Sequence, residues 1–98
     1  MIVFSEPLEF EWDKGNRGKN LIKHGVSDEK CEEVFLDENK KFWKDLSHSE
    51  KEQRYVLLGK TKLGRPLYVV FTLRGNKIRV ISARDLNKKE LKLYEKEN

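Results

Sequence analysis

The sequence is poor in the residues that build disulfides and metal sites. It contains one cysteine, Cys31, and two histidines among 98 residues. A single cysteine excludes an internal disulfide and a cysteine-rich zinc site, and a metal site would have to rely on carboxylates. We therefore expect no metal and no other cofactor. No stretch is long and apolar enough to span a bilayer, and the start lacks the features of a signal peptide, so we expect a cytoplasmic protein without a membrane partner.

Apolar residues are also scarce, because 37% of the chain is hydrophobic and 39% is charged. A chain of this length can bury one thin core, so we predict a single domain over residues 1–98. There are 21 Lys and Arg residues against 17 Asp and Glu residues, which gives a formal net charge of +4. This mild excess is compatible with a polyanionic partner but does not by itself indicate one.

The first half of the chain predicts a strand and two helices. Apolar and acidic residues alternate over residues 8–12, the pattern of a half-buried strand. Asp13 can cap a helix that stops at Gly25, a residue suited to the left-handed C-terminal position. Gly15 and Gly18 would lie inside this helix and weaken it by about 1 kcal/mol each, so packing must hold it.

Ser27 can cap a second helix, on which Cys31, Val34 and Phe35 form one apolar stripe. The charged stretch that follows contains an aromatic pair and predicts a short edge strand near Phe42. Both predicted helices thus precede the main strands of the chain.

Three stronger strands follow, joined by short turn-like connections that predict an antiparallel meander. They span residues 54–60, 66–73 and 77–84. Asn87 can then cap a last helix, and Glu90 completes a capping-box pattern. The order of strand, two helices, strands and helix indicates an α+β fold in which helices cover one face of an antiparallel sheet.

The last strand carries two arginines. Alternation divides this strand into one face with Ile78, Val80 and Ser82 and another with Arg79, Ile81 and Ala83. Arg84 lies at the strand end, where alternation does not fix its direction. A mid-strand guanidinium needs solvent or a carboxylate partner. The alternative is a sheet face with several cations for a phosphate backbone, because a planar guanidinium binds phosphate oxygens through two hydrogen bonds.

The loop before the first of these strands groups four polar side chains, His48, Glu50, Glu52 and Arg54. An imidazole that titrates near neutral pH, a carboxylate and a guanidinium are suited to general acid–base catalysis on a phosphodiester. The alternative is a loop whose charges are only solvated. His24 is explained more simply as a helix C-terminal residue favoured by the helix dipole.

Three segments together resemble the BrnT-type toxins of bacterial type II toxin–antitoxin systems. They are FEWDKGNRGKNLIKHGVS (10–27), HSEKEQRYVLLG (48–59) and IRVISARDLNKKELKLYE (78–95). Their order and spacing are those of the family, and they cover almost the whole chain. The resemblance implies a metal-independent ribonuclease with a RelE-like fold that cleaves RNA and inhibits translation and growth. It also implies neutralisation by a BrnA-type antitoxin, a ribbon-helix-helix protein, and binding of the complex to operator DNA.

The matching family positions are Asn20, Lys23, His24, Gly25, His48, Glu52, Arg54, Arg79, Ser82, Arg84 and Glu90. We predict catalytic roles for His48, Glu52, Arg54, Arg79 and Arg84. We predict RNA contacts for Arg17, Lys19, Lys23, Lys77 and Lys88. Some family members carry a lysine where this chain has Asn16, so the neighbouring Arg17 or Lys19 would take over an RNA contact made there.

Such a ribonuclease must activate a 2′-hydroxyl, stabilise a pentacoordinate phosphorane and protonate the leaving 5′-oxygen. Guanidinium groups fixed on a rigid sheet supply preorganised positive charge for that transition state. Two alternatives stay open, a non-catalytic RNA-binding module and a protein-interaction domain whose charges are only solvated. The sequence does not assign the general base.

Overall fold

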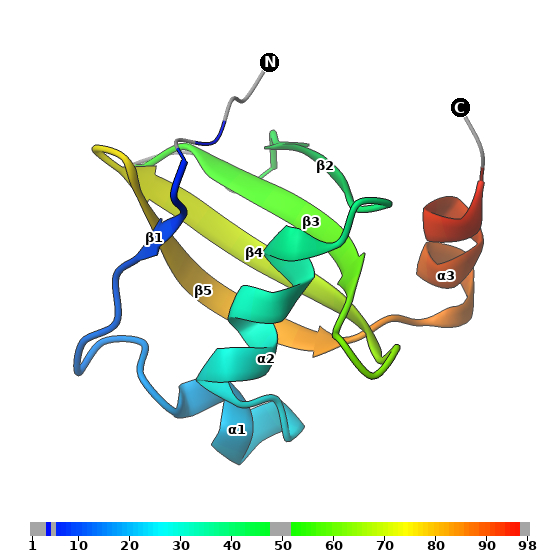
Figure 1. The fold of residues 1–98 in the computed structure, drawn as a ribbon, viewed down its shortest axis with the longest axis horizontal. Coiled ribbons are helices and arrows are strands. Elements are labelled where there is room, and N and C mark those ends of the chain that lie inside the picture. The colour runs from blue at the N-terminus through cyan, green and yellow to red at the C-terminus, as the bar shows by residue number, and fades with distance from the viewer. Residues whose placement is uncertain (1–3, 5, 48–51, 97–98) are drawn as a thin grey trace.

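A computed structural model describes residue 4 and residues 6–47 and 52–96 of the chain (Figure 1). The strands are β1 (Glu9–Phe10), β2 (Lys41–Asp45), β3 (Arg54–Lys60), β4 (Pro66–Arg74) and β5 (Lys77–Asp85). They form one sheet in the order β1-β5-β4-β3-β2. The predicted α+β class and the antiparallel meander are confirmed. The sheet is mixed at one edge, because β1 pairs with β5 in parallel.

The helices are α1 (Lys19–His24), α2 (Asp28–Glu33) and α3 (Lys88–Glu95), and the 3-10 helix η1 (Val34–Leu36) continues α2. Two helices thus precede the meander and one follows it, as predicted. The cap predicted at Ser27 is confirmed, since its side chain accepts a hydrogen bond from the backbone N–H of Lys30, but the cap predicted at Asp13 is wrong, because α1 begins after Gly18. Asn87 and Glu90 form the complete capping box of α3. The edge strand expected near Phe42 is β2.

Helices pack against both faces of the sheet, and not against one face as predicted. The larger apolar cluster contains Val26, Cys31, Val34, Phe35, Leu57, Leu67, Val69, Phe71, Ile78, Val80 and Ala83. Val56 and Leu58 instead join a second cluster with Tyr94 of α3. Because successive side chains of β3 point to opposite faces, the two clusters lie on opposite sides of the sheet. α3 therefore covers part of the face that α1 and α2 leave open.

The first helix is shorter than predicted. α1 begins at Lys19, and residues 14–18 form turns where the sequence predicted helix. Gly18 has a φ of 69°, in the left-handed region that glycine adopts without strain, so the chain enters α1 from a turn. At the other end, Gly25 has a φ of 67° and its N–H caps the helix, as predicted.

A bulge in β5 changes which side chains face the core. The register between β4 and β5 skips Ile81, which has no partner in β4. Ala83 is thereby returned to the face of the larger cluster. Ser82 and Arg84 consequently share a face with Arg79, so strict alternation was wrong beyond the bulge.

Candidate functional site

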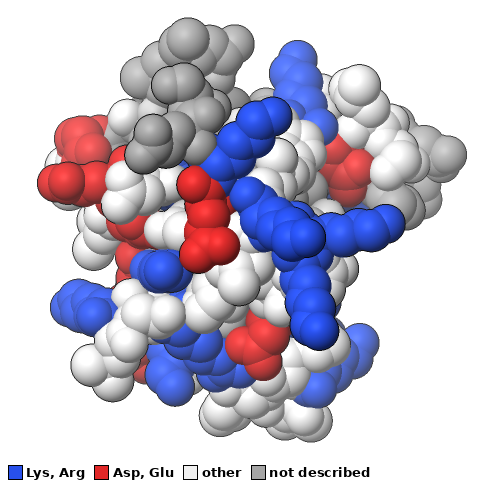
Figure 2. Space-filling model, turned by 90° about the vertical axis from the view of Figure 1, so that its right-hand side faces the viewer, with Lys and Arg blue, Asp and Glu red and all other residues white. Residues whose placement is uncertain are grey.

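The sheet face opposite α1 and α2 carries arginines from three adjacent strands. Arg54 of β3 stands opposite Thr72 of β4, and Thr72 stands opposite Arg79 of β5, so the three form one cross-strand row. We call this surface the arginine face and define it by Arg54, Arg74, Arg79 and Arg84. Figure 2 views the side of the molecule that carries α3 and shows many Lys and Arg side chains gathered there, with acidic residues among them.

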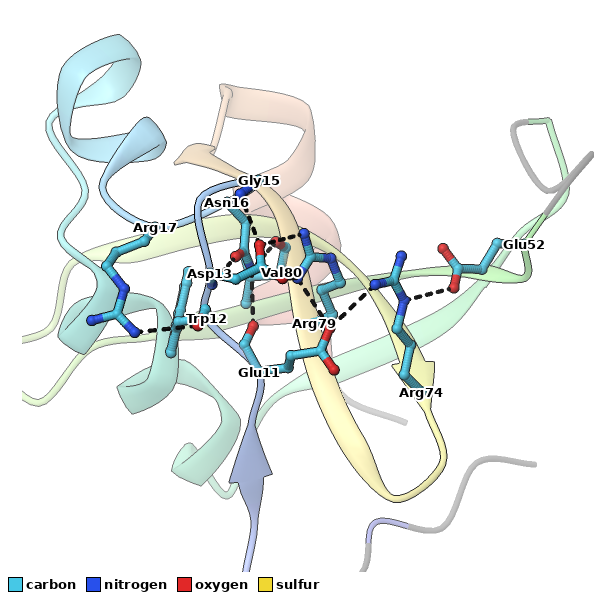
Figure 3. A network of polar contacts seen from close by, with 10 residues as sticks. All are labelled: Glu11, Trp12, Asp13, Gly15, Asn16, Arg17, Glu52, Arg74, Arg79 and Val80. Carbon is cyan, nitrogen blue, oxygen red and sulfur yellow. Dashed lines mark hydrogen bonds and ion pairs between the residues drawn. The ribbon is translucent and has the colours of Figure 1, made fainter.

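Arg79 is held by two carboxylates from the segment that follows β1 (Figure 3). Its Nη1 donates to Glu11 Oε1 at 3.0 Å and to Asp13 Oδ2 at 2.9 Å, and its Nη2 donates to Asp13 Oδ1 at 3.0 Å. The hydrogen bonds from Arg79, followed by one from the N–H of Gly15, lower the pKa of Asp13. The interpretation of Arg79 as a carboxylate-paired arginine therefore holds.

Arg74, which the sequence analysis did not single out, extends this network. Its Nη1 lies 3.2 Å from Glu11 Oε1, the same oxygen that Arg79 contacts. Its Nε donates to Glu52 Oε2 at 3.1 Å. The result is a chain of alternating charges, Glu52–Arg74–Glu11–Arg79–Asp13, drawn in Figure 3. Periodicity could not reveal it, because the partners come from distant parts of the chain.

Arg84 is also paired with a carboxylate, but at the far end of β5. Its Nη1 and Nη2 each lie 2.8 Å from an oxygen of Glu90, and the guanidinium carbon lies 4.0 Å from the ring centre of Tyr68. The hydrogen bonds from Arg84 lower the pKa of Glu90, which also belongs to the α3 capping box. Arg84 thus anchors the start of α3 to the sheet.

The structure brings three of the predicted catalytic residues together. Glu52 lies two residues before Arg54, and Arg54 shares a row with Arg79. Arg84 is farther away, because Arg84 and Arg79 stand opposite residues four positions apart on β4, which is roughly 13 Å at about 3.3 Å per residue. His48 and Glu50 lie outside the described residues.

The five predicted RNA-binding cations, Arg17, Lys19, Lys23, Lys77 and Lys88, are all exposed. They do not form one cluster in sequence or along the fold. Lys19 and Lys23 belong to α1, Lys88 begins α3, and Lys77 stands opposite Arg74 beside the arginine face. Arg17 donates from Nη2 to the carbonyl oxygen of Trp12 at 3.2 Å.

Two buried asparagines serve the backbone around β5. Asn16 donates from Nδ2 to the carbonyl oxygens of Glu11 and Val80, at 2.9 and 3.1 Å. Asn20 accepts from the N–H of Ala83 at 3.0 Å. Because β1 pairs with only the first part of β5, these amides satisfy polar groups along the rest of that edge. Both side chains therefore support the backbone along this edge of the sheet.

Other chemistry is limited in the part of the chain that the structure describes. No three His, Cys, Asp or Glu side chains among those residues come together as a metal site. Burial, followed by the charge of Asp28, raises the pKa of the Cys31 thiol to about 12, so this thiol is a poor nucleophile. Within the described ranges, every helix is too short or too polar to cross a membrane.

One protein-family model matches residues 12–90, and its description is ribonuclease toxin, BrnT, of type II toxin–antitoxin system. The chain belongs to the BrnT family. The match begins at Trp12 and ends at Glu90, so it includes the arginine face, α1 and α2. No curated protein matches the chain. BrnT-family membership confirms the resemblance seen in the sequence and identifies a ribonuclease toxin family.

Proposed function

We propose that this BrnT-family protein is an endoribonuclease toxin that cleaves RNA without a metal ion and so inhibits translation and growth. The single observation that carries the proposal is the row Arg54–Thr72–Arg79, which puts two strand-borne guanidinium groups on one face of the sheet. The family supplies the reaction class, and the arginine face supplies fixed positive charge for a phosphate backbone.

The proposed reaction is attack of a ribose 2′-oxygen on the adjacent phosphorus, with cleavage of the bond to the 5′-oxygen. A base accepts the 2′-hydroxyl proton, and an acid protonates the leaving oxygen. Arg54 and Arg79 would stabilise the charge on the phosphorane, and Arg84 would hold a phosphate farther along the strand. Glu52, oriented by Arg74, and His48 are the candidates for the proton transfers.

One structural feature favours the alternative of a non-catalytic RNA-binding domain. Arg79 and Arg84 both present their forked N–H groups to carboxylates, an arrangement that would serve stability alone. Catalysis therefore requires at least one guanidinium to exchange or share its carboxylate with phosphate. Substitution of these arginines separates a structural role from a catalytic one.

The proposed partners follow from the family. A cognate antitoxin of the BrnA type, with a ribbon-helix-helix fold, would neutralise the toxin, and the complex would bind operator DNA. We expect the antitoxin to cover the arginine face with acidic or apolar side chains, because this excludes RNA from the site. The protein would act in the cytoplasm, where its RNA substrate is found.

The deciding experiment is cleavage of purified RNA by purified protein in excess EDTA. Wild type should cleave, and the double variant Arg54→Ala/Arg79→Ala should not. Lys62→Ala is a matched control, because Lys62 is an exposed cation in the turn between β3 and β4. Loss of wild-type cleavage in EDTA, with recovery on adding Mg²⁺, would contradict metal independence. RNA binding without cleavage under both conditions would support the non-catalytic alternative.

A further inference from the structure

The carboxylate of Asp13 sits among donors that would equally suit a phosphate. Oδ2 accepts from Arg79 Nη1 at 2.9 Å, and Oδ1 accepts from Arg79 Nη2 at 3.0 Å. The backbone N–H of Gly15 adds a third donor, 2.7 Å from Oδ1 (Figure 3). A guanidinium fork plus a main-chain N–H is a set that binds oxyanions generally, because carboxylate and phosphate present similarly spaced oxygens.

The donors are held in place by contacts that do not involve the Asp13 side chain. Arg79 projects from the middle of β5, its side chain is only 13% exposed, and Glu11 fixes its Nη1. The turn that carries Gly15 is fastened by Asn16, whose Oδ1 accepts from the backbone N–H of Asp13. This donor set would therefore persist if the Asp13 side chain turned away.

Gly15 allows the close approach of these groups. A Cβ atom at this position would lie 2.6 Å from Arg79 Nη2, which is inside contact distance. Any side chain there would push the guanidinium away from the Gly15 N–H. By contrast, the Asp13 side chain is 53% exposed, so its carboxylate can rotate into solvent without creating a buried charge.

We infer that Arg79 and the Gly15 N–H form a phosphate-binding site that Asp13 occupies in the RNA-free protein, and that a backbone phosphate of RNA replaces the Asp13 carboxylate. This inference rests on the proposed function, because it names where one substrate phosphate binds. Glu11 stays bonded to Arg79 and Arg74 during the exchange, so the guanidinium keeps its orientation while one of its two carboxylate partners changes.

An internal carboxylate also gives selectivity between anions. Asp13 is tethered beside the donors, so it competes at a high effective concentration, and a free phosphate ion displaces it poorly. RNA contacts several cations at once, so its phosphates compete much better. Asp13 is therefore a specificity-determining residue that keeps free phosphate out of the site and admits a polyanion.

The test is titration with inorganic phosphate, followed by NMR of backbone amides and arginine side chains. Asp13→Ala should bind phosphate at least about tenfold more tightly than wild type, since the vacated donors make charge-assisted hydrogen bonds. The largest shifts should occur at the Gly15 N–H and the Arg79 guanidinium. Asp13→Asn, which keeps the shape and removes the charge, should show a smaller gain.

Asp85→Ala is the matched control, because it removes the same charge from another arginine pair on β5. Asp85 binds Arg65 through two hydrogen bonds, at 2.7 and 3.2 Å. Arg65 also donates to the carbonyl oxygens of His24 and Gly25, so it stays engaged and should gain no phosphate. Equal gains in Asp85→Ala and Asp13→Ala would overturn the inference, because they would reflect net charge alone.

A second variant guards against misfolding as an explanation. Adding Gly15→Ala to Asp13→Asn should abolish the gain, because the new Cβ displaces Arg79, while thermal melts report whether the fold is kept. No gain in either folded Asp13 variant would also overturn the inference. Phosphate binding does not depend on cleavage. If wild type failed to cleave RNA while Asp13→Ala still bound phosphate more tightly than wild type, the proposed function would be refuted and the phosphate site would stand.

Discussion

The hydroxyl of Tyr94 donates a hydrogen bond to Asp37, with 2.6 Å between Oη and Oδ2. The same carboxylate group accepts from the backbone N–H groups of Lys60 and Asn39. One side chain thus joins α3 to β3 and to the loop before β2. Burial alone would raise the pKa of Asp37, but the hydrogen bonds from Tyr94 and the two amides outweigh burial and lower it.

The first prediction concerns the pH dependence of stability. Because the folded-state pKa of Asp37 lies below its unfolded value, its contribution is present above about pH 4 and is lost as the pH falls through the folded pKa. Asp37→Asn should therefore lower the free energy of unfolding by about 1–2 kcal/mol at pH 7. The difference from wild type should shrink toward pH 2. Urea titrations at both pH values measure it, with Glu38→Gln as an exposed neighbouring control, and a gap that is constant with pH would contradict it.

A second prediction concerns Asn16. Asn16→Ala should lower the free energy of unfolding by about 2 kcal/mol, because the backbone groups that it bonds lose a partner inside the protein. Asn16→Lys should lower the free energy of unfolding by at least as much. The site is buried, and among the described residues no carboxylate contacts the Asn16 side chain, so a lysine charge would lack a partner there. Chemical denaturation measures both, and Asn39→Ala, at an exposed loop position, should be near neutral. A stable Asn16→Lys variant with stronger RNA binding would instead favour an RNA-contact role.

The third prediction separates the arginines by function. Arg54→Ala and Arg79→Ala should each lower the rate of RNA cleavage by about 10²-fold, the scale for removing a preorganised transition-state donor. Lysine should rescue only in part, because it lacks the two-pronged geometry of a guanidinium. Arg84→Ala should lower both cleavage and stability, since Arg84 also anchors α3 through Glu90. Normal activity in all three folded alanine variants would remove the arginine face from the mechanism.

The fourth prediction concerns the two histidines. His48→Ala should lower the cleavage rate by about 10²-fold, which is the usual contribution of general acid–base catalysis. RNA affinity should change little. His24→Ala should mainly reduce stability, because His24 lies in the last turn of α1, where the helix dipole favours a basic side chain. Rates against pH and thermal melts distinguish these outcomes. An unchanged pH profile in His48→Ala would assign the proton transfers to Glu52 or to a lysine.

Much of the fold was predictable because local chemistry determines it. The caps at Ser27 and Asn87 and the apolar runs of the meander each act over a few residues. The parallel pairing of β1 was not predictable, because it joins residues almost 70 positions apart in the sequence. The start of α1 was missed because glycine at residues 15 and 18 favours turns that a helical pattern does not exclude.

The candidate site was predictable in part for the same reason. Arg79 stood out because a charged residue interrupts an apolar strand. Its partners Glu11 and Asp13 did not, because acidic residues are common in this chain and only the pairing of β1 with β5 brings these two close. Arg74 lies at a strand end, where a charged residue does not interrupt an apolar pattern and so does not indicate a site. The sequence thus indicated cations such as Arg79, whereas the tertiary structure determines which carboxylates pair with them.

The bulge at Ile81 works as a half-period phase shift within a single strand. Before it, even-numbered residues of β5 face the larger apolar cluster, and after it odd-numbered residues do so. If Ile81 were instead paired in regular alternation, the Arg84 guanidinium would turn inward and Ala83 outward, whereas deleting Ile81 would remove the bulge and leave both side chains on their present faces. Leaving Ile81 without a partner on β4 thus lets a strand of this length keep Ala83 in the apolar cluster and display Arg84 on the same side of the sheet as Arg79.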